Sequence, residues 1–141
     1  MIYVEEKDFN RQIQLLSFLA GGTKLFICAW LYPESSAKSL AGFEIIDNPR
    51  SLIPVTTYEN GFQPKCTSLV PASDSNIEVF GTAYAKLKKN CDSLALYKES
   101  EPSWLAATIG HEGMCLVQDS EMLNSLLQAG YSASSEAPAW W

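Results

Sequence analysis

The last third of the sequence lacks basic residues altogether. Residues 1–98 carry all ten Lys and Arg together with ten Asp and Glu, so this part is formally neutral. The whole net charge of −6 therefore comes from residues 99–141. Nucleic acids and anionic membranes bind to basic surfaces, so this distribution argues against both as partners. An acidic surface instead attracts a basic protein or a cationic small molecule. The acids are Glu99, Glu101, Glu112, Asp119, Glu121 and Glu136.

Long apolar runs are also missing. The longest, "KLFICAWLY" at residues 24–32, has about nine residues, whereas about 20 are needed to span a bilayer. The first ten residues, "MIYVEEKDFN", are acidic where a secretory signal has a basic region. We therefore expect no membrane association and a cytoplasmic location.

Metal-binding patterns are absent. The chain has a single histidine and four cysteines, Cys28, Cys66, Cys91 and Cys115, which are 38, 25 and 24 positions apart without a CxxC pair. This spacing predicts no metal site and no cofactor. We expect four reduced thiols that serve as small apolar residues of the core.

Phosphate-binding and hydrolase signatures are missing as well, because no GxGxxG, GxxxxGK or GxSxG occurs. What the chain does contain is an ordinary globular composition: 141 residues, 47% of them hydrophobic, without a repeat or a low-complexity tract. We expect one globular domain over residues 1–141.

Three segments have the apolar spacing of helices. Asp8 is placed to cap the first, in which Phe9, Ile13, Leu16 and Ala20 share a face. Ser75 and Glu78 have the spacing of a capping box for the second, with Ile77, Phe80, Tyr84 and Leu87 on its apolar face. Asp119 precedes a short third helix that ends at Gly130, with Met122, Leu123, Leu126 and Leu127 facing inward.

Strands are predicted between these helices, at residues 2–4, 24–31, 42–46, 93–97, 104–109, 114–117 and 131–134. The continuous apolarity of residues 24–31 is typical of a central strand. Asn60-Gly61 predicts a hairpin, whose second arm we place at a sheet edge because Pro64 cannot donate a hydrogen bond. Residues 34–41 suggest a helical turn. The fold class that follows is α+β, with a single-layer, mostly antiparallel sheet packed by about three helices.

The segment "GHEG", residues 110–113, contains the only histidine. Two glycines between strand-like runs are typical of a four-residue hairpin loop. A zinc-protease HExxH motif would need a second histidine on a helix, whereas Cys115 occupies that position. We therefore interpret His111 as a loop residue that can contact a ligand together with Glu112.

A cysteine hydrolase is an alternative, with a cysteine nucleophile, His111 as the base, and Asp119 or Glu112 as the orienting acid. Cys66, which follows Lys65, is a better nucleophile than the mid-strand Cys28, because a nearby cation favours the thiolate. Sequence spacing does not show that these groups meet.

The sequence ends in Trp140 and Trp141. Each tryptophan can bury about 150–250 Å², so leaving both in water is costly, and we expect this segment to be held in place. Either the two rings cover the domain's own core or pocket, or they bind a partner, since Trp is enriched among interface hot spots.

The function that these observations favour is a small, soluble, non-enzymatic binding protein. Its acidic, Trp-rich C-terminal third would contact a protein partner, for example as an inhibitor of a basic protein, or would mediate self-association. An alternative is a domain that binds a cationic or aromatic small molecule in a pocket lined by Trp30, Tyr84, Trp104 or the terminal tryptophans, where an acid such as Glu112 selects a cationic ligand. The predicted contact residues are Trp104, His111, Glu112, Trp140 and Trp141.

Overall fold

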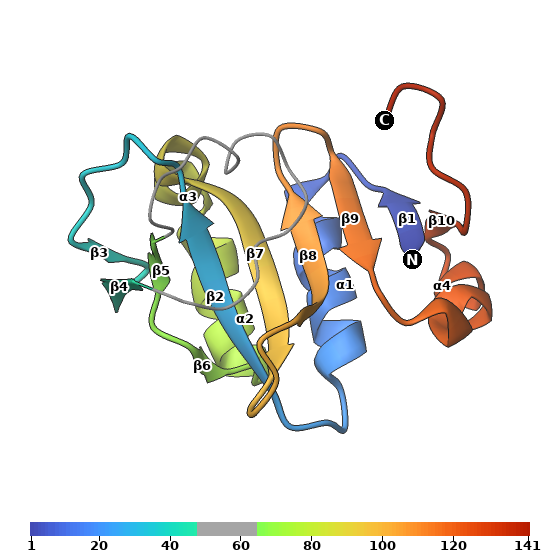
Figure 1. Ribbon diagram of the computed structural model, residues 1–141, viewed down its shortest axis with the longest axis horizontal. Coiled ribbons are helices and arrows are strands. Elements are labelled where there is room, and N and C mark those ends of the chain that lie inside the picture. Colours follow the sequence, from blue (N-terminus) through green and yellow to red (C-terminus); the bar gives the residue numbers. More distant parts are fainter. Residues whose placement is uncertain (48–64) are drawn as a thin grey trace.

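The computed structural model describes residues 1–47 and 65–141 (Figure 1). Within this part, ten strands form one sheet in the order β10-β1-β9-β8-β7-β2-β5-β4-β3, with β6 paired to β2, and every pairing is antiparallel. The predicted α+β class is confirmed, although the described part has four α-helices instead of three. The strands are β1 (Ile2–Glu5), β2 (Leu25–Leu31), β3 (Ser39–Leu40), β4 (Phe43–Asp47), β5 (Lys65–Thr67), β6 (Val70–Pro71), β7 (Cys91–Lys98), β8 (Trp104–Ile109), β9 (Met114–Val117) and β10 (Ser132–Ser134). The helices are α1 (Phe9–Ala20), α2 (Asp74–Thr82), α3 (Tyr84–Asn90), the 3-10 helix η2 (Ser120–Met122) and α4 (Leu123–Gln128).

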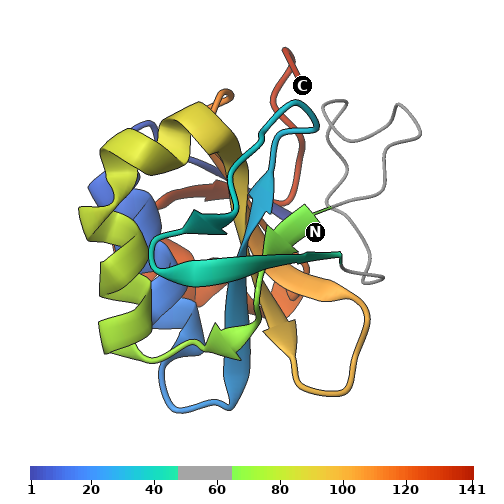
Figure 2. The same ribbon diagram turned by 90° about the vertical axis from the view of Figure 1, so that its left-hand side faces the viewer.

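Both faces of the sheet are buried. Helices α1, α2 and α3 cover one face (Figure 2), where Ile27 and Ala29 of β2 pack in one cluster with helix side chains such as Leu16 and Phe80. Successive strand residues point to opposite faces, so Cys28 and Trp30 belong to a second buried cluster. Burial on both sides explains the continuous apolarity of β2, whose predicted central position is confirmed.

Helix α1 begins as the sequence predicts. The Asp8 carboxylate accepts a hydrogen bond from the Asn10 backbone N–H at 2.9 Å, and Gly21 caps the other end. Leu15 and Leu16 are fully buried against the sheet. The apolar residues on one side of α1 therefore determine which face packs against the sheet, and the Asp8 cap determines where the helix starts.

The predicted second helix is two helices. Its cap is Ser73 instead of Ser75, because the Ser73 hydroxyl accepts from the Asn76 N–H at 3.2 Å. The helix is interrupted at Ala83, and a second helix, α3, begins at the next residue. This break leaves Tyr84 exposed, whereas a continuous helix was expected to bury it.

Other local predictions are corrected by long-range pairing. Residues 34–41 contain no helical turn and end in β3, because Ser39 and Leu40 pair with β4. The Asn60-Gly61 hairpin and Pro64 lie outside the described residues, but β5, which follows them, lies inside the sheet between β2 and β4 instead of at an edge. In α4 only Leu126 is buried, and Leu127, expected to face inward, is exposed.

Thr108 completes the β7–β8 ladder with its side chain. Its buried hydroxyl accepts a hydrogen bond from the Leu94 backbone N–H at 3.0 Å. We expect Thr108→Val, which keeps the shape but removes the acceptor, to lower the free energy of unfolding by about 1–3 kcal/mol, because a buried N–H loses its partner. Urea denaturation measures this loss. Thr108→Ser, which retains the hydroxyl, is the matched control, and equal stability of the two variants would contradict the assigned role.

Candidate functional site

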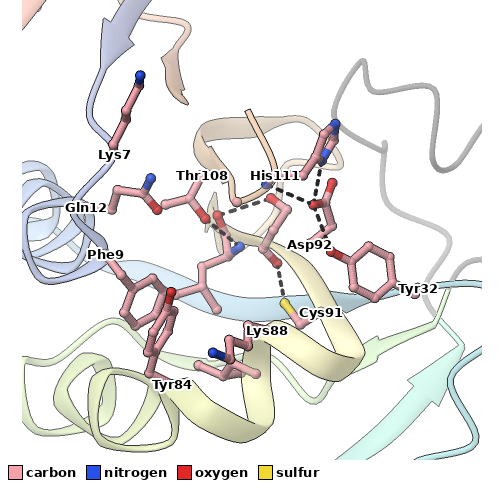
Figure 3. A pocket seen from close by; sticks show the side chains of 14 residues that line it. Lys7, Phe9, Gln12, Tyr32, Tyr84, Lys88, Cys91, Asp92, Thr108 and His111 are labelled. Carbon is pink, nitrogen blue, oxygen red and sulfur yellow. Dashed lines mark hydrogen bonds and ion pairs between the residues drawn. The ribbon is translucent and has the colours of Figure 1, made fainter. Parts of the chain in front are cut away.

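A cleft of about 290 Å³ lies where the start of β7 and the β8–β9 turn meet α3 and the beginning of α1 (Figure 3). One side carries a buried acid and a histidine, another carries two aromatic rings and Lys88, and Lys7 lies apart from these at the edge of the view in Figure 3. The residues that line it are Lys7, Phe9, Gln12, Tyr32, Tyr84, Leu87, Lys88, Cys91, Asp92, Ser93, Leu94, Thr108, Gly110 and His111.

The β8–β9 turn places His111 at the cleft. Strands β8 and β9 are joined by the four residues 110–113, so the predicted hairpin loop is confirmed. Gly113 has a φ of +63°, which favours glycine. The Gly110 N–H donates to the Asp92 carbonyl oxygen at 2.8 Å, which ties the turn to the start of β7.

Asp92 is the central polar group of the site. Its side chain is fully buried, and Oδ1 accepts hydrogen bonds from His111 Nδ1 at 2.7 Å, from the Tyr32 hydroxyl at 3.2 Å and from the His111 N–H at 3.4 Å (Figure 3). The buried Oδ2 has no hydrogen-bond partner among the described residues. An unmatched buried acceptor costs about 1–3 kcal/mol, so Asp92 is held in place by one oxygen while the other remains unsatisfied.

His111 lies between two carboxylates. Its Nδ1 contacts Asp92, and its Nε2 lies 3.1 Å from Oε1 of Glu112. A neutral imidazole donates from one nitrogen only, so both contacts are hydrogen bonds at once only when both nitrogens carry protons. The His111 side chain is 41% exposed, so it is the more exposed of the two side chains that bond to Asp92.

Tyr32 is held as a hydrogen-bond donor. Burial raises the pKa of its phenol well above the ordinary value, and the neighbouring Asp92 raises it further. The hydroxyl therefore keeps its proton and donates to Asp92 throughout the physiological pH range.

The opposite side of the cleft is aromatic and cationic. The rings of Phe9 and Tyr84 are stacked with their centres 4.4 Å apart, and the Lys88 ammonium group lies 5.5 Å from the centre of the Tyr84 ring. Within the described part of the chain, neither Lys7 nor Lys88 forms an ion pair. Two ammonium groups thus remain available for an anionic group of a ligand.

Neither Cys28 nor Cys66, the two cysteines considered as nucleophiles, lines the cleft with His111. Cys66 is fully buried in β5, belongs to the second core cluster and does not line the cleft. Cys91 does line it, but its thiol donates to the Ser93 carbonyl oxygen at 3.2 Å, and burial raises its pKa. All four cysteines are buried and none forms a disulfide, in agreement with their predicted role in the core.

None of the remaining predicted contact residues lines the cleft itself. Glu112 contacts His111 at the rim of the cleft, whereas Trp104 is buried in the second cluster at the other end of β8. Trp140 and Trp141 are 52% and 43% exposed. They contact each other edge to face, and the Trp141 ring contacts Tyr3 of β1 with ring centres 5.7 Å apart.

Comparison of the chain with protein-family models, with curated proteins and with solved structures gave no match. The function of the cleft is therefore inferred from its own geometry. Among the described residues, no helix is long and apolar enough to cross a membrane. The same residues contain no group of three or more His, Cys, Asp or Glu side chains that is arranged to hold a metal ion.

Sequence reasoning identified His111 and Glu112 but missed Asp92, Lys7 and Lys88. Asp92 had one usable signal: it is an acid directly before the apolar run "SLALY", where a buried charge requires a partner. That partner is the histidine of the next hairpin, which only the pairing of β7 with β8 reveals.

Gly113 in the β8–β9 turn lies close to Lys7, which lines the cleft. A Cβ at this position would lie 2.9 Å from Cγ and 3.4 Å from Cα of Lys7, in addition to requiring a positive φ. We expect Gly113→Ala to lower the free energy of unfolding by about 2–4 kcal/mol, because about 1–2 kcal/mol of backbone strain adds to the clash. The matched control is Gly130→Ala, which has φ +85° and no atom within 4 Å of the new Cβ. Equal losses in urea denaturation would show that the contact with Lys7 is unimportant.

Alkaline pH is expected to destabilise the fold. Burial raises the pKa of Cys91 and Cys115 above the ordinary value near 9. Above about pH 9 these thiols ionise in the unfolded chain but stay protonated in the folded one, so stability present at lower pH is lost as the pH rises. The loss approaches about 1.4 kcal/mol per pH unit for each thiol once the pH is well above 9. Unfolding free energies at pH 8, 9 and 10 in a reducing buffer measure it. Cys115→Ala should weaken the dependence, and a flat profile for the unchanged chain would refute it.

Proposed function

We propose that the chain binds a small molecule in the cleft beside Asp92, without catalysing a reaction on it. The observation that supports this proposal most strongly is the buried Oδ2 of Asp92, an acceptor that no described residue satisfies. A ligand that donates a hydrogen bond to this oxygen recovers the interaction that the fold leaves unmade. The ligand we infer therefore carries an ammonium, guanidinium or hydroxyl group.

The size and chemistry of the cleft support a compact ligand. Its volume of about 290 Å³ is at the lower end for small-molecule sites. The stacked rings of Phe9 and Tyr84 offer an apolar wall for the part of the ligand that does not contact Asp92. Hydrogen bonds to a charged group contribute about 1.5–3 kcal/mol each, so Asp92 accounts for a large share of the affinity of a small ligand.

Access to Oδ2 involves His111. The carboxylate is enclosed, and the imidazole bonded to its other oxygen is the most exposed of its partners. We infer that the donor group of the ligand reaches Oδ2 when the His111 ring shifts toward solvent. His111 thus acts as the outer wall of the site, and Glu112 holds the far side of its ring.

The test is a thermal-shift screen with small amines, guanidines, amino alcohols and the twenty amino acids. At least one compound is expected to raise the Tm of the unchanged chain and of Glu121→Gln, which removes an exposed acid that does not line the cleft. The same compound should not raise the Tm of Asp92→Asn. The proposal fails if no compound stabilises the unchanged chain, or if the hits stabilise Asp92→Asn equally.

A second proposal is a protein contact through Tyr3, Trp140 and Trp141. It is favoured by the large exposed fraction of the two tryptophans and by their contact with each other and with Tyr3. Such amphipathic rings supply much of the binding energy of interfaces. A basic protein, or a second copy of the chain, is the partner that we propose for this surface.

The double variant Trp140→Ser, Trp141→Ser tests the protein contact. If self-association uses this surface, light scattering at increasing concentration will detect oligomers of the unchanged chain but not of the variant. If the partner is a basic protein, its binding will weaken with added salt as well as in the variant. The proposal fails if the unchanged chain is monomeric and if neither added salt nor the double variant weakens its binding to a basic protein.

A further inference from the structure

We propose that the ligand of the cleft is a compact zwitterion, whose ammonium group binds Asp92 and whose carboxylate or phosphate group binds Lys88. This inference rests on the proposed function and specifies the class of ligand.

The charges that line the cleft are of both signs. Asp92 supplies a buried negative charge with an unsatisfied oxygen. Lys7 and Lys88 supply two positive charges, neither of which is ion-paired within the described residues. The chain as a whole has a net charge of −6. Two lysines without an ion pair among the described residues therefore give the cleft local positive charges, in contrast to the chain as a whole.

These opposite charges lie on different sides of the cleft. Figure 3 shows Asp92, His111 and Tyr32 together on one side, and Lys88 with Tyr84 and Phe9 on the other. Lys7 extends from the segment before α1, and Lys88 comes from α3. A ligand that spans the cleft therefore meets an acceptor at one end and the Lys88 ammonium group at the other.

A ligand of one sign satisfies only half of this site. A simple amine would pair with Asp92 but would approach two like charges, which lowers its affinity. A simple acid would pair with the lysines but would leave Oδ2 of Asp92 without a donor and would face its charge. A molecule with both groups gains both sets of charge-assisted hydrogen bonds. The stacked Phe9 and Tyr84 rings then offer a surface for its apolar part.

The experiment is isothermal titration of the unchanged chain with a matched series. L-Phenylalanine carries both groups, phenethylamine lacks the carboxylate, and 3-phenylpropionate lacks the amine. The other amino acids and O-phosphoethanolamine complete the series and distinguish a carboxylate from a phosphate. The best zwitterion is expected to bind at least about tenfold more tightly than its amine or its acid counterpart, since each lost charged contact is worth about that factor.

Neighbouring lysines of α3 supply the matched variants. Lys88→Gln is expected to weaken the best zwitterion about tenfold, whereas phenethylamine should bind the variant at least as tightly as the unchanged chain, because a like charge is removed. Lys89→Gln, whose side chain does not line the cleft, should leave both unchanged. Lys7→Gln provides a second measurement at the other cation, and circular dichroism establishes that each variant is folded.

The outcomes separate this inference from the function on which it rests. If amines bind as tightly as zwitterions and depend on Asp92, the inference is overturned and the proposed function stands. If acids alone bind as tightly as zwitterions, without dependence on Asp92, both are overturned. If no zwitterion in the series binds measurably, the inference is overturned, and the amines and guanidines of the screen then decide the proposed function.

Discussion

Asp92→Asn is expected to weaken ligand binding by about 10–100-fold. The substitution replaces the unsatisfied Oδ2 with an NH2 group, so a donor from the ligand meets another donor, and the negative charge is lost. A charged hydrogen bond contributes about 1.5–3 kcal/mol, and 1.4 kcal/mol corresponds to a factor of ten in affinity. Titration calorimetry with L-phenylalanine and phenethylamine measures the change.

The same substitution should preserve the fold. In the unchanged chain His111 and Tyr32 bond to Oδ1 of Asp92. The amide oxygen of asparagine can take the place of Oδ1 and accept the same two hydrogen bonds. Asp92→Ala would instead leave these donors without an acceptor, and we expect it to destabilise the fold by about 2–4 kcal/mol. Glu121→Gln controls for the change in net charge. Unaltered affinity in Asp92→Asn would mean that Oδ2 is not where the ligand binds.

Trp30→Ala is expected to lower the free energy of unfolding by about 3–5 kcal/mol. Trp30 is fully buried in β2, and its indole N–H donates to the Tyr97 hydroxyl at 2.9 Å. The strand itself lies between β7 on one side and β5 and β6 on the other. Truncation removes a large apolar side chain from an interior that cannot fully close over the space, so Tm should fall by about 10 °C or more.

The matched control for Trp30→Ala is Trp140→Ala, which removes the same side chain from a position where it is 52% exposed. The control should cost less than about 1 kcal/mol, since surface substitutions are seldom more costly. The comparison also decides between two roles for Trp30, because a tryptophan that lines a ligand site can be truncated without unfolding the chain. Similar stability of the two variants would contradict the assignment of Trp30 to the core.

Local signals predicted those parts of the fold whose causes are local. Asp8 caps α1, and two glycines shape the turn that carries His111, so both features follow from residues a few positions apart. Strands β8 and β9 have the predicted bounds for the same reason. The break at Ala83 was missed because the apolar spacing continues across it, although Tyr84 turns outward to stack on Phe9.

The candidate site was only partly predictable because it is assembled over long sequence distances. Asp92 meets a histidine 19 positions later and a tyrosine 60 positions earlier. No pattern within one element indicates such a contact. The sequence therefore identified the histidine as a polar loop residue, and the pairing of the strands was needed to give it an acidic partner.

The acidic C-terminal third illustrates the same limit. Its charge is a property of the sequence, but β8 is six residues long and separates the acids by about 20 Å. Glu112 lies at one end of the β8–β9 hairpin, whereas Asp119 and Glu121 follow β9 at the other end. Glu112 thus lies far from Asp119 and Glu121, so the net charge of this third does not by itself locate a binding surface.

The central claim is that the cleft at Asp92 is the ligand site, and its most direct test is ¹H–¹⁵N spectroscopy of the labelled chain during titration with L-phenylalanine and phenethylamine. The account predicts that the largest amide shifts occur at Ser93, Thr108, Gly110 and His111, which line the cleft. They should disappear in Asp92→Asn. Shifts confined to Tyr3 and the indole signals of Trp140 and Trp141 would contradict the account.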